Sequence, residues 1–128
     1  MSNPFTHAAA SFDPTATSVL LWTRAPGVET LRWAVATDPA LAAIVASGEV
    51  APDPARDHTA VVDVSGLDPA TTYFYRFEVG GQRSPVGRTR TLGDGSIDRL
   101  RLGLVTCARF SVAPLGAYRA LAQGYVIG

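Results

Sequence analysis

Hydrophobic and polar residues alternate along roughly the first ninety residues of the chain. Short runs rich in Val, Leu, Thr, Tyr and Trp are separated by Gly, Pro, Asp and Ser at intervals of about ten residues. This pattern is typical of an all-β sandwich with many short strands. The expected strands cover residues 18–25, 30–38, 58–66, 71–81 and 83–92, with further extended structure over "IVASGEV".

The segment "DPALAA" carries the one helical pattern of this region. Asp38 has a side chain that caps helices, and Pro39 suits the first helical position. We expect a helix of one or two turns there, before extended structure resumes.

The segment "GLDPATTYFYRFEV" has the sequence pattern of a tyrosine corner. Leu67, Pro69, Thr71 and Tyr73 follow one another at intervals of two residues. We expect Tyr73 to stand at the start of a strand, with its hydroxyl bonded to the backbone near Leu67. Such a bond would fix the crossover between the two sheets.

Strand alternation places Tyr73, Tyr75, Phe77 and Val79 on one face of this strand. Closely spaced tyrosines can also stack on a ligand, but the alternation favours a place in the core. We expect Trp22 and Trp33 to face them. In pattern the region resembles the fibronectin type III-like and immunoglobulin-like β-sandwiches, a likeness of fold that names no function.

After residue 92 the pattern changes. Residues 93–98 are a linker rich in Gly, Asp and Ser, and "LRLGLVTC" is then a nearly continuous apolar run, as in a strand covered on both faces. Leu115, Tyr118, Leu121 and Ala122 follow at helical spacing, and "YVIG" begins another apolar run. Residues 99–128 therefore predict the truncated opening of an α/β domain, strand then helix then strand onset, after a sandwich over 1–92.

Composition narrows the function classes. The formal net charge is zero, with 11 acidic and 11 basic residues, and all the basic ones are arginine. A nucleic-acid partner is not expected, because such proteins usually carry a basic excess. No apolar run approaches the roughly 20 residues that span a bilayer. The first residues, "MSNPFTHAAA", lack the basic and apolar regions of a signal peptide.

Several segments together resemble the amino-terminal part of the alkaline phosphatase D family, the PhoD-type phosphodiesterases and alkaline phosphatases. They are "FTHAAASFDPTATSVLLWTR", "LRWAVATD", "IVASGEV", "DHTAVVDVSGLDPATTYFYRFEVGGQRSPVGRTRT" and "LRLGLVTCARF". The resemblance implies a β-sandwich before a metallophosphoesterase domain, with iron and calcium in the full-length enzymes. It also implies that the parent protein is secreted or periplasmic.

The resemblance further implies that Cys107, at the end of the apolar run, is an iron ligand in the full-length enzyme. The sequence alone, without the resemblance, instead favours a small, buried apolar side chain at this position. One cysteine cannot hold a catalytic metal alone, because such sites need several protein ligands. For this fragment we therefore expect no cofactor and no catalytic residues.

Other polar residues give weaker indications. His7 and His58 are far apart in sequence and are expected at the surface rather than in a metal cluster. Arg76, Arg88 and Arg90 are expected to line one outer face of the last two strands. There they could discourage strand-to-strand aggregation or form a docking surface for another domain.

Two functional hypotheses remain open. In the first, the chain is the accessory sandwich of a PhoD-like enzyme, inactive alone, whose partner is its own catalytic domain. In the second, it is a free-standing fibronectin-like module that binds a protein or a glycan. Under the first hypothesis the Arg99–Cys107 strand lacks its neighbours, and we expect self-association through it.

Overall fold

The computed structural model describes residues 3–95, 97–104 and 116–122. The chain divides into two compact units, Met1–Ser96 and Ile97–Gly128, and each is described by itself.

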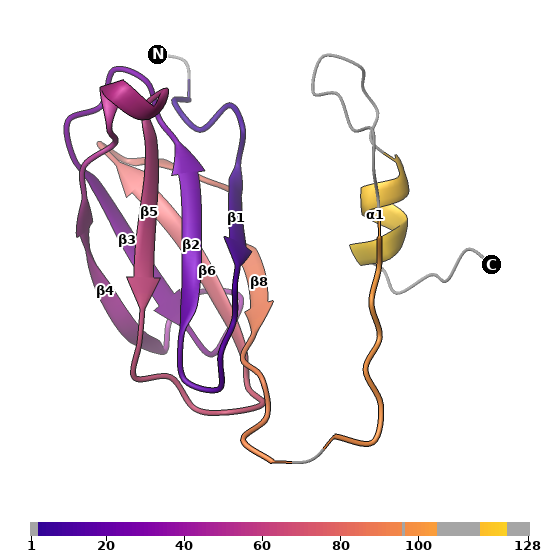
Figure 1. The fold of residues 1–128 in the computed structure, drawn as a ribbon. Helices are drawn as coiled ribbons and strands as arrows, with labels where there is room; N and C mark the ends of the chain where they lie inside the picture. Colours follow the sequence, from indigo (N-terminus) through magenta and orange to yellow (C-terminus); the bar gives the residue numbers. More distant parts are fainter. Residues whose placement is uncertain (1–2, 96, 105–115, 123–128) are drawn as a thin grey trace. The chain divides into compact units, whose positions relative to one another are not determined.

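The first unit is a sandwich of two antiparallel sheets (Figure 1). The three-stranded sheet has the order β1 (Ala9–Phe12), β2 (Val19–Arg24) and β5 (Thr59–Val64). The five-stranded sheet has the order β4 (Ile44–Val50), β3 (Leu31–Ala36), β6 (Thr72–Val79) and β7 (Gln82–Arg83), and β8 (Gly87–Arg90) pairs with β6. A short 3-10 helix, η1 (Pro54–Arg56), precedes β5. The all-β sandwich expected from the hydrophobic pattern is confirmed.

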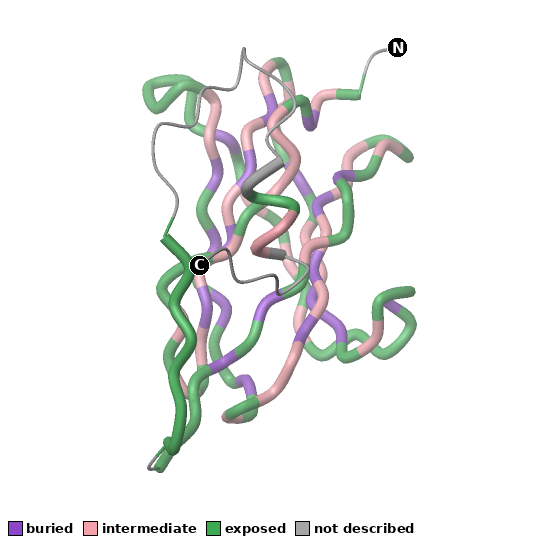
Figure 2. Tube along the Cα trace, turned by 90° about the vertical axis from the view of Figure 1, so that its right-hand side faces the viewer, coloured by how far each residue is buried: buried purple, intermediate pink, exposed green. Residues whose placement is uncertain are grey.

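The core lies between the sheets and follows the alternation of each strand, visible as changes of colour along the strands in Figure 2. Tyr73, Tyr75 and Phe77 of β6 are buried, as predicted, and Val79 packs against the same cluster. Trp33 of β3 also packs against this core. Its indole lies over Gly48 of β4, where a Cβ atom would stand 2.9 Å from the ring.

The expectation that Trp22 faces the core tyrosines is wrong. The buried residues of β2 are Val19, Leu21 and Thr23, so Trp22 lies on the outer face of the three-stranded sheet and is half-buried there. Thr23 can take the inner position because its hydroxyl donates to the carbonyl of Ala8 at 2.7 Å. The strand is apolar on both faces, and the sequence therefore did not distinguish the inner face from the outer one.

The tyrosine corner is confirmed. The hydroxyl oxygen of Tyr73 accepts a hydrogen bond from the backbone N–H of Asp68 at 2.8 Å, and the Tyr73 side chain is buried. Buried Thr91 holds the same loop from the other side. Its hydroxyl donates to the carbonyl of Asp68 at 2.6 Å and accepts from the N–H of Thr71 at 3.0 Å.

The residue after Thr91 joins this loop to a second one. The N–H of Leu92 donates to the carbonyl of Thr15 at 2.9 Å, and the carbonyl of Leu92 accepts from Ala70 at 2.8 Å. Thr15 belongs to the loop between β1 and β2. The end of the sandwich is thereby bonded to two separate loops.

The helix expected at "DPALAA" is wrong; this segment is a turn. The Asp38 carboxylate accepts from the N–H groups of Ala43 at 2.8 Å and Ala42 at 3.1 Å. Leu41 has a φ of 53°, a left-handed backbone conformation that does not occur inside a right-handed helix. The hydrogen bonds from Ala43 and Ala42 hold the pKa of Asp38 below its ordinary value.

In the second unit, residues 97–104 are extended and α1 (Gly116–Ala122) is helical, within the segment that showed helical spacing. The strand expected from Arg99 is not formed in the described part, 99–104, since a strand needs a neighbour for its backbone groups. Cys107 and the "YVIG" segment lie outside the described residues. None of the described helices is long and apolar enough to cross a membrane.

Candidate functional site

The described residues do not form a metal centre: they contain no group of three His, Cys, Asp or Glu side chains that could hold an ion. Cys107, the residue that resemblance assigns to iron, lies outside the described part of the chain.

His7 and His58 lie near one carboxylate, a proximity that their separation in sequence did not indicate. His7 stands in a turn before β1, where its Nδ1 lies 2.9 Å from the Thr6 hydroxyl. The Arg24 guanidinium donates to Asp57 Oδ1 at 3.0 Å and holds the pKa of Asp57 below its ordinary value. The charges of His58 and His7 act in the same direction.

The outer face of the five-stranded sheet gathers most of the arginines of the sandwich. Since Tyr73, Tyr75 and Phe77 of β6 point into the core, the alternate residues of β6 and their partners in register point outward. The arginines on this face are Arg32 of β3, Arg76 of β6, Arg83 of β7, and Arg88 and Arg90 of β8.

Two of these arginines neutralise one acidic residue. Arg32 Nη2 lies 2.9 Å from Glu78 Oε1, and Arg83 Nε lies 3.0 Å from Glu78 Oε2. Each pair joins residues that are directly opposite in the register of the sheet. Both Glu78 oxygens are therefore occupied by guanidinium groups.

In the register of the sheet, none of the other three arginines lies directly opposite an acidic residue. Arg90 lies opposite Thr72, and Arg90 Nη1 donates to the Thr72 hydroxyl at 3.2 Å. Arg88 lies opposite Phe74 in the next row. In the described part of the chain, Arg76 makes no ion pair or hydrogen bond through its side chain. On its β3 side, Arg76 lies opposite Ala34, which is uncharged.

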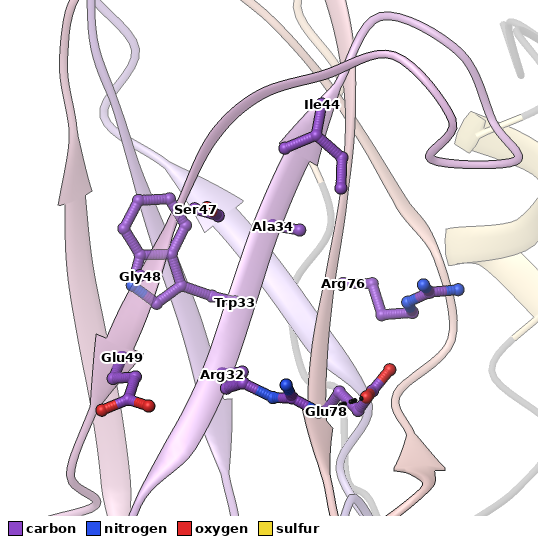
Figure 3. A pocket seen from close by; sticks show the side chains of 9 residues that line it. All are labelled: Arg32, Trp33, Ala34, Ile44, Ser47, Gly48, Glu49, Arg76 and Glu78. Carbon is purple, nitrogen blue, oxygen red and sulfur yellow. Dashed lines mark hydrogen bonds and ion pairs between the residues drawn. The ribbon is translucent and has the colours of Figure 1, made fainter.

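Two shallow hollows lie on this face. One, of about 390 Å³, is lined by residues of three strands: Arg32, Trp33 and Ala34 of β3, Ile44, Ser47, Gly48 and Glu49 of β4, and Arg76 and Glu78 of β6. The other, of about 320 Å³, is lined by Thr72, Arg88, Thr89 and Arg90. Figure 3 shows Arg32 directed toward Glu78, whereas the Arg76 guanidinium points away from that pair. The Arg76 guanidinium is therefore directed away from the ion pairs at Glu78.

Comparisons with known proteins agree on one family. Residues 1–93 match the family model described as the PhoD-like phosphatase N-terminal domain. The chain is 33% identical, over 95% of its length, to alkaline phosphatase D of Bacillus subtilis (strain 168), and spans 23% of that protein. It also resembles the solved structure of PhoD, with a TM-score of 0.69 and 39% identity, over 72% of this chain and 20% of that one.

The fold is shared more widely. A fibronectin type III domain from a human protein matches with a TM-score of 0.50 and 14% identity, over 79% of this chain and 84% of that domain. At that identity the likeness concerns the fold alone. The family match over residues 1–93, together with 33% identity across nearly the whole chain, shows that the chain belongs to the PhoD-like phosphatases and contains their N-terminal domain.

Proposed function

We propose that the chain is the amino-terminal accessory sandwich of a secreted or periplasmic metal-dependent phosphomonoesterase or phosphodiesterase, and that it is inactive on its own. The observation that carries this proposal is the family match to an N-terminal domain over residues 1–93. The chain spans 23% of its curated relative, which leaves most of that protein for other functions.

We propose iron and calcium for the whole enzyme and not for this chain alone. The residues that the structure describes do not fit such ions, because no three potential ligands come together among them. We propose Cys107 as an iron ligand that acts with ligands from the remaining part of the enzyme.

A second candidate is a free-standing module that binds a protein or a glycan. The outer face of the three-stranded sheet favours it, because Phe12 is 43% exposed, Val61 is 50% exposed and Trp22 lies beside Val61 in the register. Aromatic and aliphatic side chains on an open sheet face are suited to such partners.

The purified 128-residue chain, supplied with iron and calcium, is expected to release no product from a chromogenic phosphodiester. The physical reason is the ligand count, since metal-activated hydrolysis needs several ligands around each ion. The matched sample is alkaline phosphatase D of Bacillus subtilis, which should turn over the same substrate with the same metals. Metal-dependent turnover that copurifies with the 128-residue chain would contradict the proposal.

We also propose that the 128-residue chain associates with itself through the segment from Arg99 to Cys107. In its described part, Leu100, Leu102 and Leu104 are 65%, 85% and 88% exposed. Exposed leucines on an extended segment favour pairing with a second chain.

Light scattering should therefore give a mass above that of a monomer for the 128-residue chain. The double variant Leu102→Asp and Leu104→Asp should be monomeric, because charges in a paired apolar strand would be buried without partners. The control is Val86→Asp, an exposed loop position of the sandwich. A monomeric parent chain would refute this self-association.

A further inference from the structure

We propose that the free edge of β4 receives residues 99–104 of a second copy of the chain as an added antiparallel strand. This inference rests on the proposed self-association, because it names the surface that accepts the segment. In strand addition, backbone hydrogen bonds supply the affinity and alternate side chains supply the specificity. The edge and the segment must therefore match in both respects.

β4 is an edge strand, and the described residues pair it with β3 alone (Figure 1). It is 7 residues long, and its outer side presents backbone N–H and C=O groups to another chain. Edge strands are often protected by Lys or Pro, whereas β4 reads IVASGEV, with Glu49 as its one charged residue. A bulge at Val45 disturbs the first residues of β4, so regular pairing is available over residues 46–50.

The inner row of β4 has small side chains. Ala46 and Val50 pack against the core cluster, and Gly48 stands between them on the same face. The Trp33 indole over Gly48 is only half-buried. Large apolar side chains on an added strand would therefore cover apolar surface at this edge.

The outer row of β4 contains an acidic group without a partner. Ser47 and Glu49 are exposed. Glu49 lies opposite Arg32, but Arg32 bonds Glu78 instead. Within the described part of the chain, the Glu49 carboxylate makes no hydrogen bond or ion pair. A cation on an added strand would therefore find a free carboxylate there.

The segment 99–104 has the complementary pattern. Its sequence is RLRLGL, and its leucines alternate with Arg99, Arg101 and Gly103. Leu121 of α1 lies over Gly103, where a Cβ atom would stand 2.9 Å from Leu121 Cδ2. The leucines, which point to the other side of the extended segment, are exposed. Neither Arg99 nor Arg101 bonds another described side chain.

One antiparallel register matches large side chains with small ones and a cation with the free carboxylate. The opposed pairs in it are Leu100 with Val50, Arg101 with Glu49, Leu102 with Gly48, Gly103 with Ser47, and Leu104 with Ala46. A shift by one residue would turn the leucines outward and the arginines toward the core. The side chains therefore select this register as well as this edge.

The edge strand β5 of the other sheet is the competing acceptor. Its outer residue Asp63 could also pair with an arginine. Its inner residues Ala60, Val62 and Val64 are already buried, however, so leucines added beside them would cover little apolar surface. The burial of the two edges therefore favours β4.

The test is light scattering of the 128-residue chain, kept reduced so that Cys107 forms no disulfide. The edge variant, Ser47→Arg with Glu49→Arg, places cations beside Arg101 of the incoming segment. Its association constant should fall by about tenfold or more relative to the parent. Adding Arg101→Glu to the edge variant restores opposite charges across the pair and should recover the association.

The matched control is Val61→Arg with Asp63→Arg. It changes the formal charge by the same amount, at exposed outward positions of β5. This control should associate like the parent. Circular dichroism of each variant confirms that it is folded.

A mixing experiment identifies the two surfaces that meet. The edge variant and the double variant Leu102→Asp and Leu104→Asp are compared at a concentration where the parent is associated. Each alone should be monomeric, whereas their equimolar mixture should form a species of two chains. The intact segment of the first variant fits the intact edge of the second.

Three results would overturn the inference. An edge variant that associates as strongly as the parent would mean that two segments pair with each other, and the proposed self-association would then stand without this acceptor. Equal weakening in the β5 control would mean that only total charge matters. A mixture that stays monomeric would exclude the pairing of segment with edge. A monomeric parent would refute self-association itself, and the activity assay tests the accessory role separately.

Discussion

Replacing Gly87 with alanine is expected to destabilise the sandwich by about 3 kcal/mol, the upper range for overpacking a core. Gly87 lies opposite Tyr75 in the β6–β8 ladder, on the core side of the sheet. A Cβ atom at this position would overlap Tyr75 Cζ and Oη and would lie 2.6 Å from Cε2. Tyr75 is 3% exposed, so a shift of its ring would disturb the surrounding core. Burial also raises the pKa of its hydroxyl.

Urea denaturation followed by tryptophan fluorescence measures this effect as a lower midpoint. The matched control is Gly95→Ala, since a Cβ at Gly95 has no neighbour within 4 Å. Gly95→Ala should leave the midpoint unchanged. If Gly87→Ala also left it unchanged, the close approach of the Tyr75 ring to β8 would be refuted.

The Tyr73→Phe variant is expected to lose about 1–3 kcal/mol of unfolding free energy. The change removes the hydroxyl oxygen that accepts from the Asp68 N–H at 2.8 Å, and leaves a backbone donor without its partner. The ring itself is kept, so the loss reports on the hydrogen bond rather than on a cavity.

Thermal and urea unfolding of Tyr73→Phe should both show this loss. Tyr118→Phe is the control, because Tyr118 is 43% exposed on α1. The structural role of the corner hydroxyl would be disproved by two variants of equal stability.

Much of the fold could be predicted from period-two alternation, because β6 buries Tyr73, Tyr75 and Phe77 and leaves mostly polar residues on its other face. The corner at Tyr73 was predictable for a similar reason: its pattern lies within seven residues of one segment. The faces of β2 were not predictable, since Leu20 and Trp22 are as apolar as Val19 and Leu21. At Asp38, the sequence showed a capping residue, but the carboxylate holds a turn instead of a helix.

The positions of the arginines on the outer face of the five-stranded sheet were only partly predictable from the sequence. The sequence placed Arg76, Arg88 and Arg90 on one outer face, and the β6–β8 register confirms this. The pairing of Arg32 and Arg83 with Glu78 was not predictable, because it depends on how β3 and β7 align with β6. Register between distant strands is set by the packing of the whole sandwich rather than by local pattern.

The hydrogen bonds of Thr91 and Leu92 give the sandwich a mechanical property. A pull on the chain that follows Leu92 is transmitted first to the loops that hold Thr15 and Ala70, and not to β8 alone. The load is thus shared between the β1–β2 loop and the tyrosine corner. In a protein that continues beyond the sandwich, a force on the following part would load these two loops first, while β8 stays paired with β6.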